Sequence, residues 1–395
     1  MHTVADAPAP VEPRLLDALA LLARVADELG VRSARDTHLA WLARVHGLLE
    51  RPTGGAARLP EVAHRGIAGT VYGSIGLGFR AAALGLGAAA AAGLGAPLET
   101  AGRGRFVRSA VNGLIGDRLA EEGSRLAIRM AVRHEGRDLP VRADELTRAH
   151  PTATGQVVLF LHGLCENEDY WGLHRDVLGT TYAETLSGLG WTPVFLRANT
   201  GLPLRENGVA LTALLRDLVD GWPVPVDRIA LVGHSMGGLV MRAAAAVASD
   251  VAAPWTRLVS DVVTLGTPHL GSPVAAGVGR GSAALARFPE GAAFGRILDW
   301  RSVAVHDLVE GLSEDVPPLP HARYRLVSAT LTATPGHPVG AFLGDLLVRV
   351  PSAYGRTPGR DDLFPGATVL HVGRADHFDL LNHRDVHTAL KEWLA

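Results

Sequence analysis

The chain has 395 residues, of which 47% are hydrophobic, and its 38 basic residues nearly balance its 40 acidic ones. This length exceeds that of a usual single domain, so we expect one catalytic domain with an appendage. No basic cluster is interleaved with aromatic residues, and nucleic acid is therefore excluded as an expected partner.

The start of the chain carries no recognisable targeting signal. Residues 1–13 are Ala/Pro-rich and acidic, without a basic segment followed by an apolar run, so we expect them to be disordered and not to form a signal peptide. The single cysteine, Cys165, excludes an intramolecular disulfide and fits a reducing compartment. We expect a cytoplasmic protein.

Helical patterns dominate the first part of the chain. Apolar residues recur at helical spacing in 13–28, and 35–50 and 106–122 show a similar character. A hairpin is predicted next, turning at Gly136. We therefore divide the chain into an accessory helical region, 1–125, and a catalytic domain, 126–395.

One stretch within the helical region raises the question of a membrane. Residues 67–97 are mostly Ala, Gly and Leu, long enough to span a bilayer, and interrupted by Arg80. Packed helices are the favoured interpretation, because an arginine inside a span costs about 2.5–3.5 kcal/mol. Peripheral membrane contact through 67–97 stays open as the alternative.

From Gln156 onward, short apolar runs alternate with helical stretches, which is typical of strands buried on both faces of a parallel sheet. We expect an α/β fold with a mostly parallel, doubly wound sheet. Residues 271–322 contain many apolar side chains and are a predicted cap or lid that could line an acyl pocket. The apolar runs are 157–161, 193–196, 229–232, 262–265, 324–328 and 368–372.

The third of these runs leads into a candidate nucleophile. Gly233-His-Ser-Met-Gly237 is a G-x-S-x-G motif between a predicted strand and a predicted helix, and it occurs once in the chain. Such a turn exposes a serine hydroxyl, and the following helix directs free N–H groups at a developing oxyanion. Ser235 is therefore the predicted nucleophile. The alternative is a glycine-rich turn in which Ser235 only caps a helix.

The loop after the first strand, 161–167, is expected to supply the second oxyanion donor. The predicted donors are the backbone N–H groups of Leu164 and Met236. Cys165 is a rival nucleophile, although a lone cysteine is more often a small buried hydrophobe. His162 and His234 are interpreted as shaping the loop and the elbow.

The base should follow the last strand of such a sheet, because the chain order is nucleophile, acid, histidine. That strand is predicted at 367–373, and His377 comes directly after it. His377 is the predicted base, and His383 is the second choice.

The acid should follow the preceding strand, where it can hold the imidazole tautomer. Asp345 is the best placed after the strand near 324–330. Asp361 and Asp362 are the fallbacks.

These motifs resemble the lipase and esterase branch of the α/β hydrolases, including bacterial triacylglycerol lipases and GPI-inositol-deacylase-like proteins. The similarity covers about 156–395. It implies Ser235 as nucleophile, Asp345 as acid and His377 as base, while Leu346 stands where a glycine is common. The matching pieces are His162-Gly163, G-H-S-M-G-G at 233–238, T-L-G-T-P-H-L-G-S at 264–272, the G-D segment at 344–353 and D-H-F-D-L-L at 376–381.

The expected activity is hydrolysis of a carboxylic ester with an apolar, lipid-like acyl group through an acyl-enzyme. Acyl transfer, thioesterase and amidase activity stay open, because the same triad serves them all. A non-catalytic, membrane-associated binding module is the alternative from another class. No cofactor or metal is expected, since no cluster with ligand spacing stands out, and the oligomeric state is left open.

Overall fold

The computed structural model describes residues 12–50, 58–247, 255–272, 303–312, 316–357, 359 and 361–395. Most of the predicted cap and nearly all of the predicted disordered start lie outside these residues. The described residues fall into two compact units, one ending at Gly104 and one beginning at Arg105.

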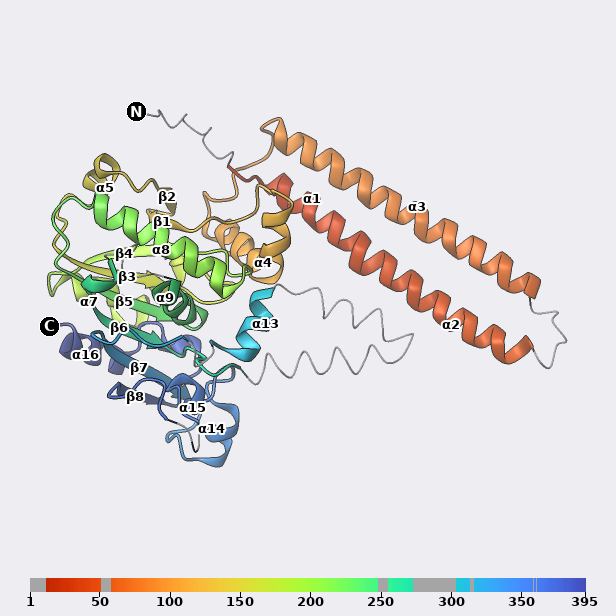
Figure 1. The fold of residues 1–395 in the computed structure, drawn as a ribbon. Helices are drawn as coiled ribbons and strands as arrows, with labels where there is room; N and C mark the ends of the chain where they lie inside the picture. The colour runs from red at the N-terminus through yellow and green to blue at the C-terminus, as the bar shows by residue number, and fades with distance from the viewer. Residues whose placement is uncertain are drawn as a thin grey trace. The chain divides into compact units, whose positions relative to one another are not determined.

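The first unit is a long helical hairpin. Helix α1 (Leu15–Val25) continues through a π-helical segment, η1 (Ala26–Val31), into α2 (Arg32–Glu50), and α3 (Arg58–Ala91) lies antiparallel beside them (Figure 1). By length and composition α3 could cross a membrane, and 11% of its most apolar window is buried.

The arginine that interrupts the apolar stretch has a counter-ion in this hairpin. Asp27 of η1, whose side chain is 3% exposed, lies 3.2 Å from the Arg32 guanidinium and 3.9 Å from that of Arg80. Asp27 can approach because Gly76 has no side chain: a Cβ there would lie 2.4 Å from the Asp27 Oδ1 atom. The charge of Arg80 is thus compensated within the unit.

The second unit is built on one eight-stranded sheet with the order β2-β1-β4-β3-β5-β6-β7-β8. The pairs from β4 to β8 are parallel, and β1 runs antiparallel to β2 and β4. This confirms the predicted mostly parallel, doubly wound sheet. The strands are β1 (Ala131–His134), β2 (Arg137–Leu139), β3 (Gln156–Leu161), β4 (Thr192–Arg197), β5 (Arg228–His234), β6 (Val259–Leu265), β7 (Arg323–Thr330) and β8 (Thr368–Gly373).

Helices cover both faces of this sheet, which explains why the strands read as continuous apolar runs. In β3, Leu159 and Leu161 enter one buried cluster and Val158 and Phe160 enter the other, because successive side chains alternate between faces. The first cluster is covered by α5 (Ala143–Ala149), α8 (Leu204–Gly221), α9 (Met236–Val247), α10 (Trp255–Leu258), α13 (Val303–Glu310) and α15 (Val350–Ala353). The second is covered by η2 (Glu168–Gly172), α7 (Tyr182–Ser187), η3 (Phe378–Leu380) and α16 (Arg384–Trp393). Two further short helices are α6 (Arg175–Leu178) and α14 (Pro338–Leu343).

Helix α4 (Gly102–Glu121) packs, from Arg105 on, within the unit that contains the sheet. Asn112 binds the segment before β1: its Nδ2 donates to the Leu126 carbonyl at 2.8 Å and its Oδ1 accepts from Ile128 N at 2.9 Å. The sequence pattern groups α4 with the helical region up to residue 125, whereas these contacts group it with the sheet.

Gly116 allows α4 to pack closely against the loop after β4, and this contact can be tested by substitution. A Cβ at Gly116 would lie 1.9 Å from the Asn199 Oδ1 atom. We expect Gly116→Ala to lower the free energy of unfolding by about 1–3 kcal/mol, because the loop after β4 must shift. The measurement is urea denaturation followed by circular dichroism. Gly172→Ala is the control, since a Cβ there meets nothing within 4 Å, and equal midpoints for both variants would contradict the packing.

Candidate active site

Ser235 lies on a strained turn between β5 and α9. Its φ of 51° is in the left-handed region, which non-glycine residues rarely adopt. The flanking glycines make this turn possible: a Cβ at Gly233 would lie 2.6 Å from Gly238 N, and one at Gly237 would lie 2.3 Å from the Leu161 carbonyl oxygen. The serine is thus held tightly between β3, β5 and α9, which is the geometry of a nucleophile elbow.

The end of β6 supports the elbow from the other side. Ser235 N donates to the Leu265 carbonyl at 2.8 Å, and Thr267 Oγ1 donates to the Ser235 carbonyl at 2.9 Å. Between them, Gly266 leaves room for the His377 ring: a Cβ there would lie 3.0 Å from His377 Cε1. The elbow and the His377 ring therefore contact the same short segment, a role for Gly266 and Thr267 that the motif alone does not reveal.

The predicted base and acid are hydrogen-bonded to each other. His377 Nδ1 lies 2.8 Å from Asp345 Oδ2, and both side chains are buried. Asp345 Oδ1 accepts from the N–H groups of Leu347 and Val348, at 3.0 and 2.7 Å, so the carboxylate is fixed in orientation. A carboxylate at Nδ1 places the ring proton there and leaves Nε2 as the basic atom. Nε2 is buried and has no hydrogen-bond partner among the described residues.

The fallback residues lie in other local structures. His383 is the N-cap of α16, where its ring accepts from Asp385 N. Asp362 pairs with Arg356 at 3.1 Å, and Asp361 is exposed. None of these hydrogen bonds connects them to the His377 ring.

The loop after β3 passes directly beside Ser235, since a Cβ at Gly163 would lie 2.8 Å from Ser235 Cβ. Three amides of this loop are hydrogen-bonded, namely Gly163 N to Glu166 Oε2, Cys165 N to Thr200 Oγ1 and Glu166 N to the Gly163 carbonyl. Among the residues that the structure describes, no acceptor takes the amide of Leu164. Met236 begins α9, so its N–H has no partner within the helix.

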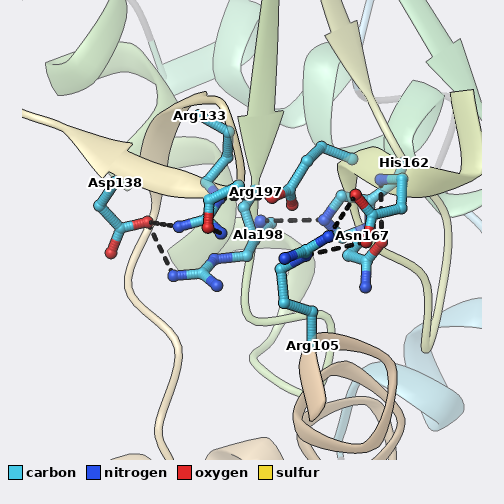
Figure 2. A network of polar contacts seen from close by, with 10 residues as sticks. Arg105, Arg133, Asp138, His162, Asn167, Arg197 and Ala198 are labelled. Atoms are coloured by element: carbon cyan, nitrogen blue, oxygen red, sulfur yellow. Dashed lines mark hydrogen bonds and ion pairs between the residues drawn. The ribbon is translucent and has the colours of Figure 1, made fainter. Parts of the chain in front are cut away.

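Polar contacts anchor this loop to neighbouring strands (Figure 2). His162 Nε2 accepts from Ala198 N at 3.2 Å and its Nδ1 donates to the Gly163 carbonyl at 2.9 Å, while burial lowers the pKa of His162. Just beyond the loop, Glu168 pairs with buried Arg133 at 2.6 Å, and Asp169 pairs with Arg105 at 2.9 Å. The histidine therefore shapes the loop, as the sequence suggests.

Glu166 is a buried residue of this site that the motifs do not point to. Its Oε2 lies 2.9 Å from His234 Nδ1, and His234 Nε2 lies 3.1 Å from the His377 carbonyl oxygen. Burial alone would lower the pKa of His234, but the charge of Glu166 and the hydrogen bonds raise it. The only sequence signal for Glu166 is its place three residues after the His162-Gly163 pair of the motif.

The surroundings of Cys165 do not favour a reactive thiolate. Its Sγ donates to the Ala110 carbonyl of α4 at 3.6 Å, and a Cβ at Gly113 would lie 2.3 Å from that sulfur. Burial, aided by the charge of Glu166, raises the pKa of the thiol to about 11. Within the described part of the chain, no three His, Cys, Asp or Glu side chains form a group that could hold a metal ion.

The sheet order, the elbow after β5 and the histidine after the last strand define an α/β-hydrolase fold. Residues 209–281 match the family model described as a PGAP1-like alpha/beta domain. The chain is 32% identical over 133 residues to a triacylglycerol lipase of Pseudarthrobacter phenanthrenivorans, covering 31% of this chain and 36% of that protein. It has the same identity over 133 residues to a triacylglycerol lipase of Burkholderia plantarii, covering 31% and 32%.

The chain also aligns with two solved structures over most of their length. The mature lipase BlEst2 of Bacillus licheniformis aligns with a TM-score of 0.43 and 22% identity over 67% of this chain and 97% of that one. Lipase 1 from Pelosinus fermentans aligns with a TM-score of 0.39 and 15% identity over 60% and 98%. The chain thus matches about a third of the length of its curated relatives. The predicted resemblance to the lipase and esterase branch of the α/β hydrolases is confirmed.

The buried thiol leads to a direct test against the rival nucleophile. We expect Cys165→Ala to keep any hydrolytic activity of the protein within about twofold of wild type, because the sulfur fills space beside α4 and a buried thiol of raised pKa is a poor nucleophile. The folded protein should also resist alkylation by iodoacetamide at neutral pH, as followed by intact-mass spectrometry. If this variant folds fully but loses activity, Cys165 is again a candidate nucleophile.

Proposed function

We propose that this protein is a serine hydrolase that cleaves carboxylic esters through an acyl-enzyme, with Ser235 as nucleophile, His377 as base and Asp345 as acid. The observation that carries the proposal is the Asp345–His377 hydrogen bond beside the segment that holds the strained Ser235 elbow. We also propose that residues 126–395 carry the catalytic residues and that 1–125 are an accessory region, of which α4 packs from Arg105 on with the sheet.

The first half of the reaction forms the acyl-enzyme. His377 Nε2 takes the proton of Ser235 Oγ as this oxygen attacks the ester carbonyl carbon. The resulting oxyanion is held by the backbone N–H groups of Leu164 and Met236, and loss of one such donor typically lowers kcat by about 10²–10³. The C–O bond to the alcohol then breaks, and the alcohol leaves with the proton from His377.

The second half of the reaction releases the carboxylic acid product. A water molecule gives a proton to His377 Nε2 and attacks the acyl carbon, and Ser235 leaves with that proton. Asp345 stabilises the imidazolium in both halves without itself taking the proton.

The proposed substrate is a small ester with an apolar acyl chain. The triacylglycerol lipase relatives support an acyl ester, and the apolar residues of 271–322 support a lipid-like one. An acyltransferase or thioesterase on the same triad is the alternative, because only the acceptor or leaving group differs.

Labelling with a fluorophosphonate probe tests the nucleophile. We expect the probe to modify Ser235, as located by mass spectrometry, and hydrolysis of p-nitrophenyl esters with acyl chains of increasing length to show a preference for longer chains. Ser235→Ala should remove labelling and lower kcat at least about 10⁴-fold, and Asp345→Asn about as much, because both act as one unit.

Each outcome of this experiment bears on a different reading. Labelling elsewhere would displace Ser235. Folded wild-type protein that neither reacts with the probe nor hydrolyses any ester would favour the non-catalytic binding module. Equal rates for all chain lengths would contradict the proposed binding of an apolar acyl chain.

We further propose that the α3 segment within residues 67–97 contacts a lipid surface. Large apolar side chains of this helix are exposed, with Ile67 at 65%, Leu77 at 63% and Leu84 at 76%. The pairing of Arg80 with Asp27 also weakens the electrostatic argument against lipid. The cytoplasmic location expected from the sequence stays a prediction.

Vesicle flotation tests this contact. We expect the full-length protein to float with vesicles of phosphatidylcholine and phosphatidylglycerol. The Leu77→Asp/Leu84→Asp variant should remain in the dense fraction, because charged side chains replace apolar area that would enter the lipid. Val177→Asp, at a position 78% exposed in the hydrolase unit, is the control and should float. If wild type fails to float but dimerises through these leucines in sedimentation, a second copy covers the helix instead.

A further inference from the structure

A buried pair, Glu166 and His234, contacts all three parts of the proposed site. Glu166 Oε2 accepts from Gly163 N at 2.7 Å and lies 2.9 Å from His234 Nδ1. His234 immediately precedes Ser235 in the chain, and its Nε2 lies 3.1 Å from the carbonyl oxygen of His377. The pair therefore connects the oxyanion loop, the elbow and the base loop, and the side chains of both residues are at most 4% exposed.

The hydrogen-bond partners fix where the protons lie. A carbonyl oxygen only accepts, so His234 Nε2 must carry a proton toward His377. The Nδ1–Oε2 contact then holds one more proton, on the imidazole or on the carboxyl, and the pair is neutral in either case. Burial opposes charge on both groups, but their attraction lowers the pKa of Glu166 and raises that of His234, which favours imidazolium and carboxylate.

We propose that Glu166 and His234 are positioning residues, a neutral ion pair that fixes the oxyanion donor and the base relative to Ser235. Fixing the Gly163 amide orients the next peptide, which carries the Leu164 N–H. Fixing the His377 carbonyl sets the backbone from which the imidazole reaches Asp345. Neither side chain touches the reacting atoms, so both act through their neighbours. This inference rests on the proposed function.

The pair needs a carboxylate and not only a side chain of the same shape. With glutamine at 166, the amide oxygen can still accept from Gly163 N, but it no longer balances an imidazolium. A neutral His234 carries a proton on one ring nitrogen only. It then loses a donor either toward residue 166 or toward the His377 carbonyl, and the geometry of one of the two loops relaxes.

Steady-state kinetics with a soluble p-nitrophenyl ester tests the proposal on the full-length protein. We expect Glu166→Gln and His234→Phe each to lower kcat about 10²-fold, the size of effect that a displacement of about 1 Å produces, with KM changed little. The double variant should lose no more than the worse single variant, because the two residues act as one unit. Asp169→Asn, the same chemical change in a half-exposed carboxylate of η2 just beyond this loop, should keep wild-type kcat.

Folding and proton position are followed separately from activity. Thermal unfolding identifies single variants that fail to fold. In that case the Glu166→Gln/His234→Phe double variant is measured in their place, because it leaves neither charge unpaired. In proton NMR of the wild type we expect a downfield His234 ring N–H signal that Glu166→Gln abolishes while shifting the His377 ring signals. Asp169→Asn should leave both unchanged.

The outcomes separate the two proposals. Folded Glu166→Gln and His234→Phe variants with kcat within about twofold of wild type, or losses that simply add in the double variant, would overturn the positioning role. Absence of the downfield signal in wild type would overturn the ion pair. Wild-type protein without hydrolysis or fluorophosphonate labelling would refute the proposed function alone, and the NMR signals would still report on the pair.

Discussion

The left-handed backbone at Ser235 is the constraint on which the site depends. A non-glycine residue in this region is strained by an amount on the order of 1–3 kcal/mol, and the strain persists only where the surroundings fix it. Here the fixing contacts come from β3 against Gly237, from the β6 carbonyl at Leu265 and from Thr267. The buried strands of the sheet hold those contacts in place, so the core of the fold stabilises the geometry of the Ser235 turn.

Parallel strands explain why residues far apart in sequence meet. The loops after β3, β5, β6, β7 and β8 all leave the sheet at the same edge, because the strands point the same way. Glu166, Ser235 and Gly266 come from the first three of these loops, and Asp345 and His377 come from the last two. Most of their contacts go to backbone atoms, so each loop is held by its neighbours.

Two of the ion pairs among the described residues have different physical roles. Asp27 in the helical unit is buried and lies 3.9 Å from the half-exposed Arg80, the one arginine in residues 67–97. Glu166 and His234 carry no net charge as a pair and connect three loops. Both Glu166 and His234 are buried, where an unpaired charge is expensive, so each requires the other.

The sequence by itself determined the doubly wound sheet, the hairpin at Gly136 and the candidate residues Ser235, Asp345 and His377, because apolar periodicity and glycine spacing are local signals. Tertiary structure decided the rest. The packing of α4 with the sheet, the space for the His377 ring at Gly266 and the partner of Arg80 all depend on contacts between distant segments. Glu166 shows the reason most clearly: a lone glutamate in a loop has no periodicity, and only the fold places it between Gly163 and His234.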